Sequence, residues 1–131
     1  MTFDPRTIAT PVYEALSGLR TQHEGNTNRL KEQKNQAVEL YTYLSTWGIM
    51  RLKAEEKALN QEGKKEVVKK FFECLQALSG IENLAAEDGL NVLKQTNLSA
   101  EAYLGLTGLG IALAQEFSFW AAAVYWNIKE E

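Results

Sequence analysis

The C-terminal segment constrains the fold of this chain most strongly, because it is apolar almost all the way round a helix. Glu116 is the only charged residue between Ala102 and Ile128. The large apolar side chains leave no wide polar face: Leu104, Leu106, Leu109, Ile111, Leu113, Phe117, Phe119, Trp120, Val124 and Tyr125. A helix of this kind is buried in a bundle or lies in a membrane. We therefore expect the chain to be built around its C-terminal helix.

Three glycines, Gly105, Gly108 and Gly110, interrupt these large residues. Each glycine costs about 1 kcal/mol against alanine in a helix interior. We therefore expect the three glycines to bring a compensating gain in stability, because they let neighbouring backbones approach this helix closely.

A membrane-spanning helix is an alternative, since about 20 mostly apolar residues cross a bilayer and segment 102–128 is long enough. Against it stands Glu116 near the middle of the segment, because a carboxylate is costly at that depth. The flank Lys129-Glu130-Glu131 offers no basic anchor. We expect a buried helix in a soluble protein.

The totals favour one soluble unit. The chain has 131 residues, which we interpret as a single helical domain over 1–131. Its one cysteine, Cys74, cannot form an internal disulfide, and residues 1–5 lack the basic start and apolar core of a signal peptide. Both features predict a cytoplasmic protein.

Proline positions and apolar spacing predict the first helix. Asp4-Pro5 and Thr10-Pro11 each place a capping residue before a proline, which suits the first helical position. A helix reaching to about residue 23 is then indicated by Val12, Leu16 and Leu19.

A single long helix is predicted over about 28–59, because this stretch has no proline and only one glycine, Gly48. Apolar side chains follow one stripe: Leu30, Ala37, Leu40, Tyr41, Leu44, Trp47 and Leu52. About thirty residues make a helix roughly 45 Å long. We expect Gly48 to mark a crossing or a kink.

The remaining segments complete an all-α fold. Residues 64–78 are amphipathic, and Ser99 caps the final helix. Between them we expect a short turn of helix around Ile81, Leu84 and Ala85 and another helical piece after Asp88-Gly89. No alternating strand pattern occurs. We expect a helical bundle of four main helices plus a short helix, with one long helix (about 28–59) and a buried C-terminal helix. We also expect the side chains of Trp47, Trp120 and Trp126 to lie in the core.

Few residues suit catalysis or metal binding. His23 is the only histidine and Cys74 the only cysteine, so neither a zinc site nor a cofactor motif is expected. Glu116 could be a catalytic acid. We expect instead that it pairs with a lysine or arginine of the second or third helix, or that it emerges at an open face. We expect the protein not to be an enzyme.

Charge is distributed unevenly along the chain. The net charge is −3, yet residues 29–70 hold ten basic and six acidic side chains and so have a charge of +4. This middle region is either a solvated pair of helices, with pairs such as Glu66–Lys70, or a surface directed at an anionic partner.

The C-terminal rhythm resembles a known signature. Ala102-Tyr103 is followed by Thr107 and by Gly110-Ile111, and Trp120-Ala121-Ala122-Ala123 closes the pattern. The mid-chain stretch Leu44–Met50 and the aromatic segment 67–78 precede it in the matching order. These segments are similar to the small subunit of type III CRISPR effector complexes, the Cmr type. Two features depart from that family, since Trp47 replaces an asparagine and no basic residue follows the C-terminal aromatics.

The resemblance implies a structural role without catalytic activity. Such subunits stack along the backbone subunits, beside the crRNA–target duplex. The implied partners are the backbone and large subunits, copies of the chain itself, and crRNA and target RNA, with no membrane. The basic middle region would then contact RNA phosphates without reading sequence. The candidate residues, with Arg51 foremost because it lies beside the mid-chain motif, are Lys31, Lys34, Arg51, Lys53, Lys57, Lys65 and Lys69.

Two alternatives stay open: a helical adaptor that binds only protein, and a membrane-associated helical protein. The RNA-binding hypothesis predicts that charge reversal at Arg51 or Lys53 weakens RNA association and leaves the fold intact. The adaptor predicts no salt-dependent binding of nucleic acid.

Overall fold

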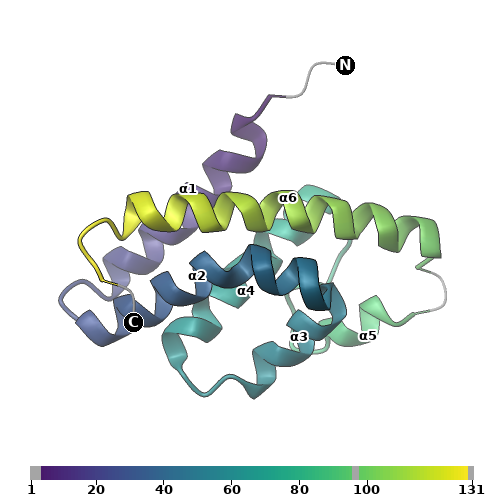
Figure 1. Cartoon of the computed structure of the whole chain (residues 1–131). Helices are drawn as coiled ribbons and strands as arrows, with labels where there is room; N and C mark the ends of the chain where they lie inside the picture. The colour runs from purple at the N-terminus through teal and green to yellow at the C-terminus, as the bar shows by residue number, and fades with distance from the viewer. Residues whose placement is uncertain (1–3, 96–97, 130–131) are drawn as a thin grey trace.

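The computed structural model describes residues 4–95 and 98–129. These residues form six α-helices and no β-strand (Figure 1). In chain order the helices are α1 (Arg6–Gln22), α2 (Thr27–Trp47), α3 (Ile49–Ala58), α4 (Glu62–Ser79), α5 (Gly89–Leu93) and α6 (Ala100–Val124). The predicted all-α fold is confirmed, and α5 is the piece predicted after Asp88-Gly89. The turn of helix predicted around residues 81–85 is wrong, because this stretch forms turns and bends.

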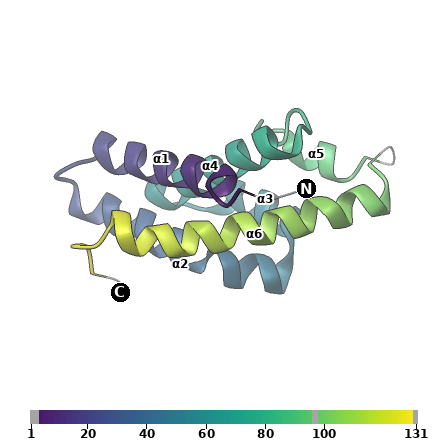
Figure 2. The same cartoon turned by 90° about the horizontal axis from the view of Figure 1, so that it is seen from above.

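Four helices, α1, α2, α4 and α6, pack around the core. α2 and α6 lie side by side and run in opposite directions in both views (Figures 1 and 2). α1 contacts α6 and α4, and α4 also contacts α2. The two shorter helices, α3 and α5, contact each other at the end of the bundle where α6 begins.

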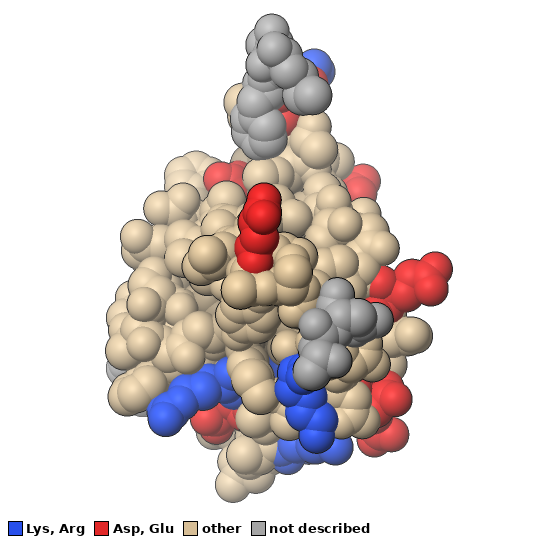
Figure 3. Space-filling view, turned by 90° about the vertical axis from the view of Figure 1, so that its right-hand side faces the viewer, with Lys and Arg blue, Asp and Glu red and all other residues tan. Residues whose placement is uncertain are grey.

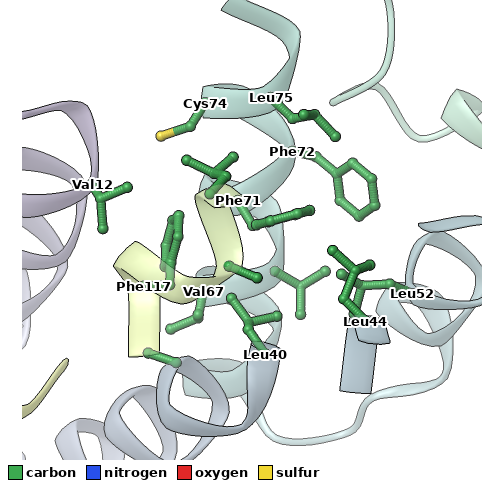
Figure 4. Close-up of a cluster of buried hydrophobic side chains, with 14 of the residues drawn as sticks. Val12, Leu40, Leu44, Leu52, Val67, Phe71, Phe72, Cys74, Leu75 and Phe117 are labelled. Carbon is green, nitrogen blue, oxygen red and sulfur yellow. The ribbon is translucent and has the colours of Figure 1, made fainter. Parts of the chain in front are cut away.

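The core is centred on α4. Phe71 lies edge-to-face against Phe72, with ring centroids 5.2 Å apart, and against Phe117 of α6, with centroids 5.8 Å apart. Leu40 and Leu44 of α2 lie beside these rings, below them in Figure 4. The amphipathic pattern predicted over 64–78 therefore places the inward residues of α4 correctly.

The long helix predicted over 28–59 is wrong as one piece, because the chain breaks at Gly48. This residue has φ 88° and ψ 172°, a conformation that glycine adopts readily and other residues do not. Its N–H donates to the carbonyl of Leu44 and ends α2, and α3 starts directly afterwards. Ile49 is fully buried while Trp47 is half exposed. The predicted kink is a complete break.

The first helix begins at Arg6, directly after Asp4-Pro5, which is one of the two predicted starts. Asp4 Oδ1 accepts a hydrogen bond from the Arg6 backbone N–H at 3.0 Å. Pro11 lies inside α1, so Thr10-Pro11 does not begin a helix. A proline in this second turn removes one intrahelical hydrogen bond without stopping the helix.

α6 is buried along one side only. Its inward residues are Leu106, Gly110, Leu113, Ala114, Phe117 and Ala121. On the outer side Leu104 and Phe119 are 72% and 63% exposed. The predicted burial of the C-terminal helix therefore holds for one face. Over the described part of the chain, no helix is both long and apolar enough for a membrane span.

Close packing against the side chains of Ile49 and Leu44 explains one of the three glycines of α6. A Cβ atom at Gly110 would lie 3.2 Å from Cδ1 of Ile49 and 3.3 Å from Cδ2 of Leu44. A Cβ atom at Gly105 or Gly108 would meet nothing within 4 Å. The prediction that all three glycines allow close approach within the chain is wrong for these two.

Candidate nucleic-acid interface

Three of the predicted basic residues, Lys57, Lys65 and Lys69, line one groove of about 500 Å³. The groove lies between the end of α3, the first half of α4 and the loop before α5. Lys65 and Lys69 are one helical turn apart and share a side of α4, because Val67, Val68 and the phenylalanines occupy its inward side. The remaining lining residues are Glu56, Glu62, Glu66, Ala85, Ala86 and Glu87.

Two of the four groove glutamates are already paired with cations that do not line the groove. Glu66 accepts hydrogen bonds from Nε and Nη2 of Arg29, both at 2.9 Å. Glu56 forms an ion pair with Lys53 at 2.8 Å. The lining itself holds three lysines and four glutamates, and the local balance becomes positive by one charge only when Arg29 and Lys53 behind two of the glutamates are counted.

Glu66 is the centre of a polar network that fixes the position of α4. His23 Nε2 lies 2.8 Å from Oε2 of Glu66, and the Gln33 amide N–H donates to Oε1 of Glu66 at 3.1 Å. Gln33 in turn accepts a hydrogen bond of 2.7 Å from the buried Tyr125 hydroxyl. The network joins α1, α2, α4 and the end of α6. Glu66 therefore pairs with Arg29 and His23 and not with Lys70, the partner that helical spacing offered.

The pKa of Glu66 reflects two opposing effects. Burial, the largest single effect, raises the pKa of this carboxyl. The hydrogen bonds from Arg29, Gln33 and His23 together outweigh burial, so the pKa is lowered overall. The carboxylate is thus held ionised at neutral pH and keeps Arg29 engaged.

Lys53 is not a surface residue, and its prediction as an RNA contact is wrong. Its side chain is only 2% exposed, and its Nζ lies 4.6 Å from the ring centre of Phe72. The ion pair with Glu56 is close, although its angles are not those of a hydrogen bond. A Cβ atom at Gly89 would lie 2.6 Å from Cε of Lys53, so α5 covers the lysine stem.

Lys31 and Lys34 lie on α2, away from the groove, and both are partly buried. Lys34 Nζ donates a hydrogen bond of 2.6 Å to the carbonyl of Ile128, which holds the segment after α6 against α2. The structure therefore gives Lys34 an internal role.

Arg51 lies on α3, and its guanidinium stacks over the ring of Trp47, with Cζ 4.7 Å from the ring centre. Lys57 is six positions further along the same helix and so points about 120° away around its axis. Arg51 is therefore on a different side of α3 from the groove. The expectation that tryptophans are core residues is wrong for Trp47 and Trp126, which are 52% and 76% exposed.

The seven predicted residues thus do not share one face. Figure 3 shows the end of the molecule at which α6 begins, where uncharged residues cover most of the surface and Lys and Arg side chains lie towards its lower edge. Lys57, Lys65 and Lys69 form one group, Arg51 lies apart, and Lys53 is buried. The groove brings together predicted residues from two different helices, α3 and α4.

The groups considered for catalysis have structural surroundings. Glu116 is partly exposed and accepts a hydrogen bond of 3.1 Å from the Trp120 indole N–H, one turn away; of the two alternatives that we expected, pairing with a lysine or arginine does not occur among the described residues. Burial raises the pKa of the Cys74 thiol to about 11, which keeps it protonated and unreactive. Across residues 4–95 and 98–129, no group of three His, Cys, Asp or Glu side chains could hold a metal ion.

Comparison with known proteins adds no relative: no protein-family model, curated protein or solved structure matches this chain. The fold and the surface features therefore define the class of protein. It is a small all-α bundle with a lysine-lined groove, an exposed arginine–tryptophan stack and an outward apolar face on α6.

Proposed function

We propose that this chain is a non-catalytic, cytoplasmic small subunit of a type III CRISPR RNA-guided effector complex. The resemblance of segments 44–50, 67–78 and 102–123 suggests the assembly. Its partners would be the backbone and large subunits, further copies of the chain, crRNA and target RNA. In this complex the chain contacts RNA phosphates through Lys57, Lys65 and Lys69, and binds its protein neighbours more strongly.

The observation that supports RNA contact most directly is the groove. Lysines from α3 and α4, separated in the sequence, converge there, while Arg29 and Lys53 pair with two of its four glutamates. Three ammonium groups along one groove suit a row of phosphates, because such contacts need positive charge and carry no base specificity. The small net charge of the groove predicts weak binding that decreases as salt increases.

The outer face of α6 favours a second candidate, an adaptor that binds only protein. Leu104 and Phe119 are exposed large apolar side chains on this face, and Gly105 and Gly108 leave it open for close contact. Contiguous exposed apolar surface marks protein interaction sites. An effector subunit would use the same face against its protein neighbours. Salt-dependent RNA binding is the property that separates the two candidates.

Replacing Lys57, Lys65 and Lys69 together by glutamine tests the groove. Each phosphate contact with single-stranded RNA contributes about −0.7 to the slope of log K against log salt. We therefore expect the triple variant to bind more weakly and its slope to be shallower by about 2. Fluorescence anisotropy of a labelled single-stranded RNA across a salt series measures both.

Lys94→Gln is the matched control, since Lys94 is an exposed lysine that does not line the groove. It should leave the slope unchanged. Identical slopes for the triple variant and the unmodified protein would contradict the groove as the RNA contact. A complete lack of salt-dependent binding by the unmodified protein would favour the adaptor.

A further inference from the structure

Trp47 is exposed in an arrangement that folding does not require. It is the last residue of α2, next to the break at Gly48, and about half of its surface is open to solvent. Arg51, one turn into α3, holds its guanidinium over the indole ring. The break thus presents a rigid aromatic ring that is braced from one side.

One shallow hollow is bordered by this ring, and a second hollow shares Tyr43 with it as a common wall. The hollow against Trp47 has a volume of about 450 Å³, and its walls are Val38, Glu39, Thr42, Tyr43, Thr46 and Trp47. The other hollow contains Arg51 and Glu55, and Glu55 accepts a hydrogen bond of 3.3 Å from the Tyr43 hydroxyl. Only the first hollow is bordered by the Trp47 ring.

The two carboxylates near Trp47 outnumber the one guanidinium of Arg51, which disfavours a phosphate as the group bound there. Glu39 lies in the wall of the hollow, and Glu55 lies on the far side of Tyr43. The hollow therefore offers an aromatic surface together with polar edges. The hydroxyls of Thr42 and Thr46 can donate and accept, and the Glu39 carboxylate accepts from an amino group. These are the features that hold an unstacked base.

We propose that Trp47 is a stacking platform for an unpaired nucleobase of single-stranded RNA, held in the hollow formed with Thr42, Thr46 and Glu39. Because Glu39 only accepts hydrogen bonds, a base with an exocyclic amino group, such as cytosine, suits the site better than uracil. Arg51 acts by bracing the ring. This inference rests on the proposed RNA-binding function and adds a base contact to the phosphate contacts of the groove.

The test compares a short oligocytidine RNA with an abasic oligomer that has the same number of phosphates. Trp47→Ala should weaken binding of the oligocytidine about tenfold and leave binding of the abasic oligomer unchanged. Trp47→Phe should recover part of the loss. Oligocytidine should quench tryptophan fluorescence in the unmodified protein and much less in Trp47→Phe.

Trp126→Ala is the matched control, because Trp126 is another exposed tryptophan, beyond the far end of α6. It should leave oligocytidine binding unchanged, and circular dichroism should show that all variants are folded. If Trp47→Ala binds oligocytidine normally while the triple lysine variant does not, the platform is overturned and the proposed function stands. If the unmodified protein binds neither oligomer at low salt, both are overturned.

Discussion

At the scale of single residues, the position of a side chain within the apolar stripe of a helix decides its burial more than its chemical type does. Lys53 lies four residues after the buried Ile49 and next to Leu52, so it belongs to the inward side of α3. Gln33 likewise occupies the stripe of α2 between Leu30 and Ala37, and it is fully buried. Helical spacing in the sequence could have predicted both positions, although residue type alone predicts a surface location.

The partners of these residues could not be predicted in the same way. Arg29 and Glu66 are 37 positions apart, and their contact depends on the register between α2 and α4. That register is set by the fit of many apolar side chains, which no local pattern describes. The same holds for Lys57 and Lys65, which meet at one groove only because α3 turns away from α2.

The Glu66 network makes a prediction about stability and pH. Because the folded-state pKa of Glu66 is below the ordinary 4.5, its ionised form stabilises the fold above that pH. The contribution is lost as the pH falls through the lowered pKa. Glu66→Gln should therefore cost about 2 kcal/mol at neutral pH, and the difference from the unmodified protein should shrink at an acidic pH below the ordinary 4.5. Urea unfolding at the two pH values measures both quantities.

Glu73→Gln is the control for this comparison. Glu73 pairs with Lys70 at 3.3 Å, but its side chain is 41% exposed, and such surface pairs contribute little. Its loss should change the free energy of unfolding by less than about 0.5 kcal/mol. A Glu66→Gln variant as stable as Glu73→Gln would show that the network does not hold the bundle together.

At the scale of helices, whether a glycine breaks a helix depends on its backbone angle φ, which the sequence does not give. The lack of proline over 28–59 correctly predicts helix on both sides of Gly48. It does not reveal that φ is positive there, and so misses the turn that separates α2 from α3. This turn buries Ile49 and exposes Trp47, the two neighbours of the glycine.

Helical glycines with and without neighbours should respond oppositely to alanine. At Gly63 of α4, a Cβ atom would lie 2.6 Å from Cβ of Glu32 and 2.7 Å from the carbonyl oxygen of Arg29. Gly63→Ala should therefore destabilise the protein by about 1–3 kcal/mol. Gly105→Ala and Gly108→Ala in α6 should each stabilise it by up to about 1 kcal/mol, because their sites are open. Thermal and urea unfolding of the three variants compare them directly.

Destabilisation of the isolated chain by Gly105→Ala or Gly108→Ala would show that these positions are not open in solution. If both variants are stabilised as expected, the glycines are not required by the fold. Their presence then agrees with a contact between the outer face of α6 and another protein, which the added methyl groups should weaken. Pull-down of protein partners by each variant measures that effect.

At the scale of the whole molecule, the class of fold and the dominant helix were predictable from apolar spacing. The number of helices and the exposure of α6 were not, because they depend on how much of α6 the remaining helices can cover. α1, α2 and α4 contact one side of it, and Leu104 and Phe119 are left outside. A helix that is apolar on both sides but covered on one has a free face for the protein contact that we propose.

The central claim is that this chain works as an RNA-bearing assembly subunit. The most direct measurement is to express it with an affinity tag in its own host, purify it at moderate salt, and sequence the RNA that co-purifies. We expect short RNAs with a repeat-derived tag together with larger partner proteins. The variant with glutamine at Lys57, Lys65 and Lys69 should co-purify with less of this RNA. Recovery of protein partners without RNA would contradict the claim and identify the chain as a protein-binding adaptor.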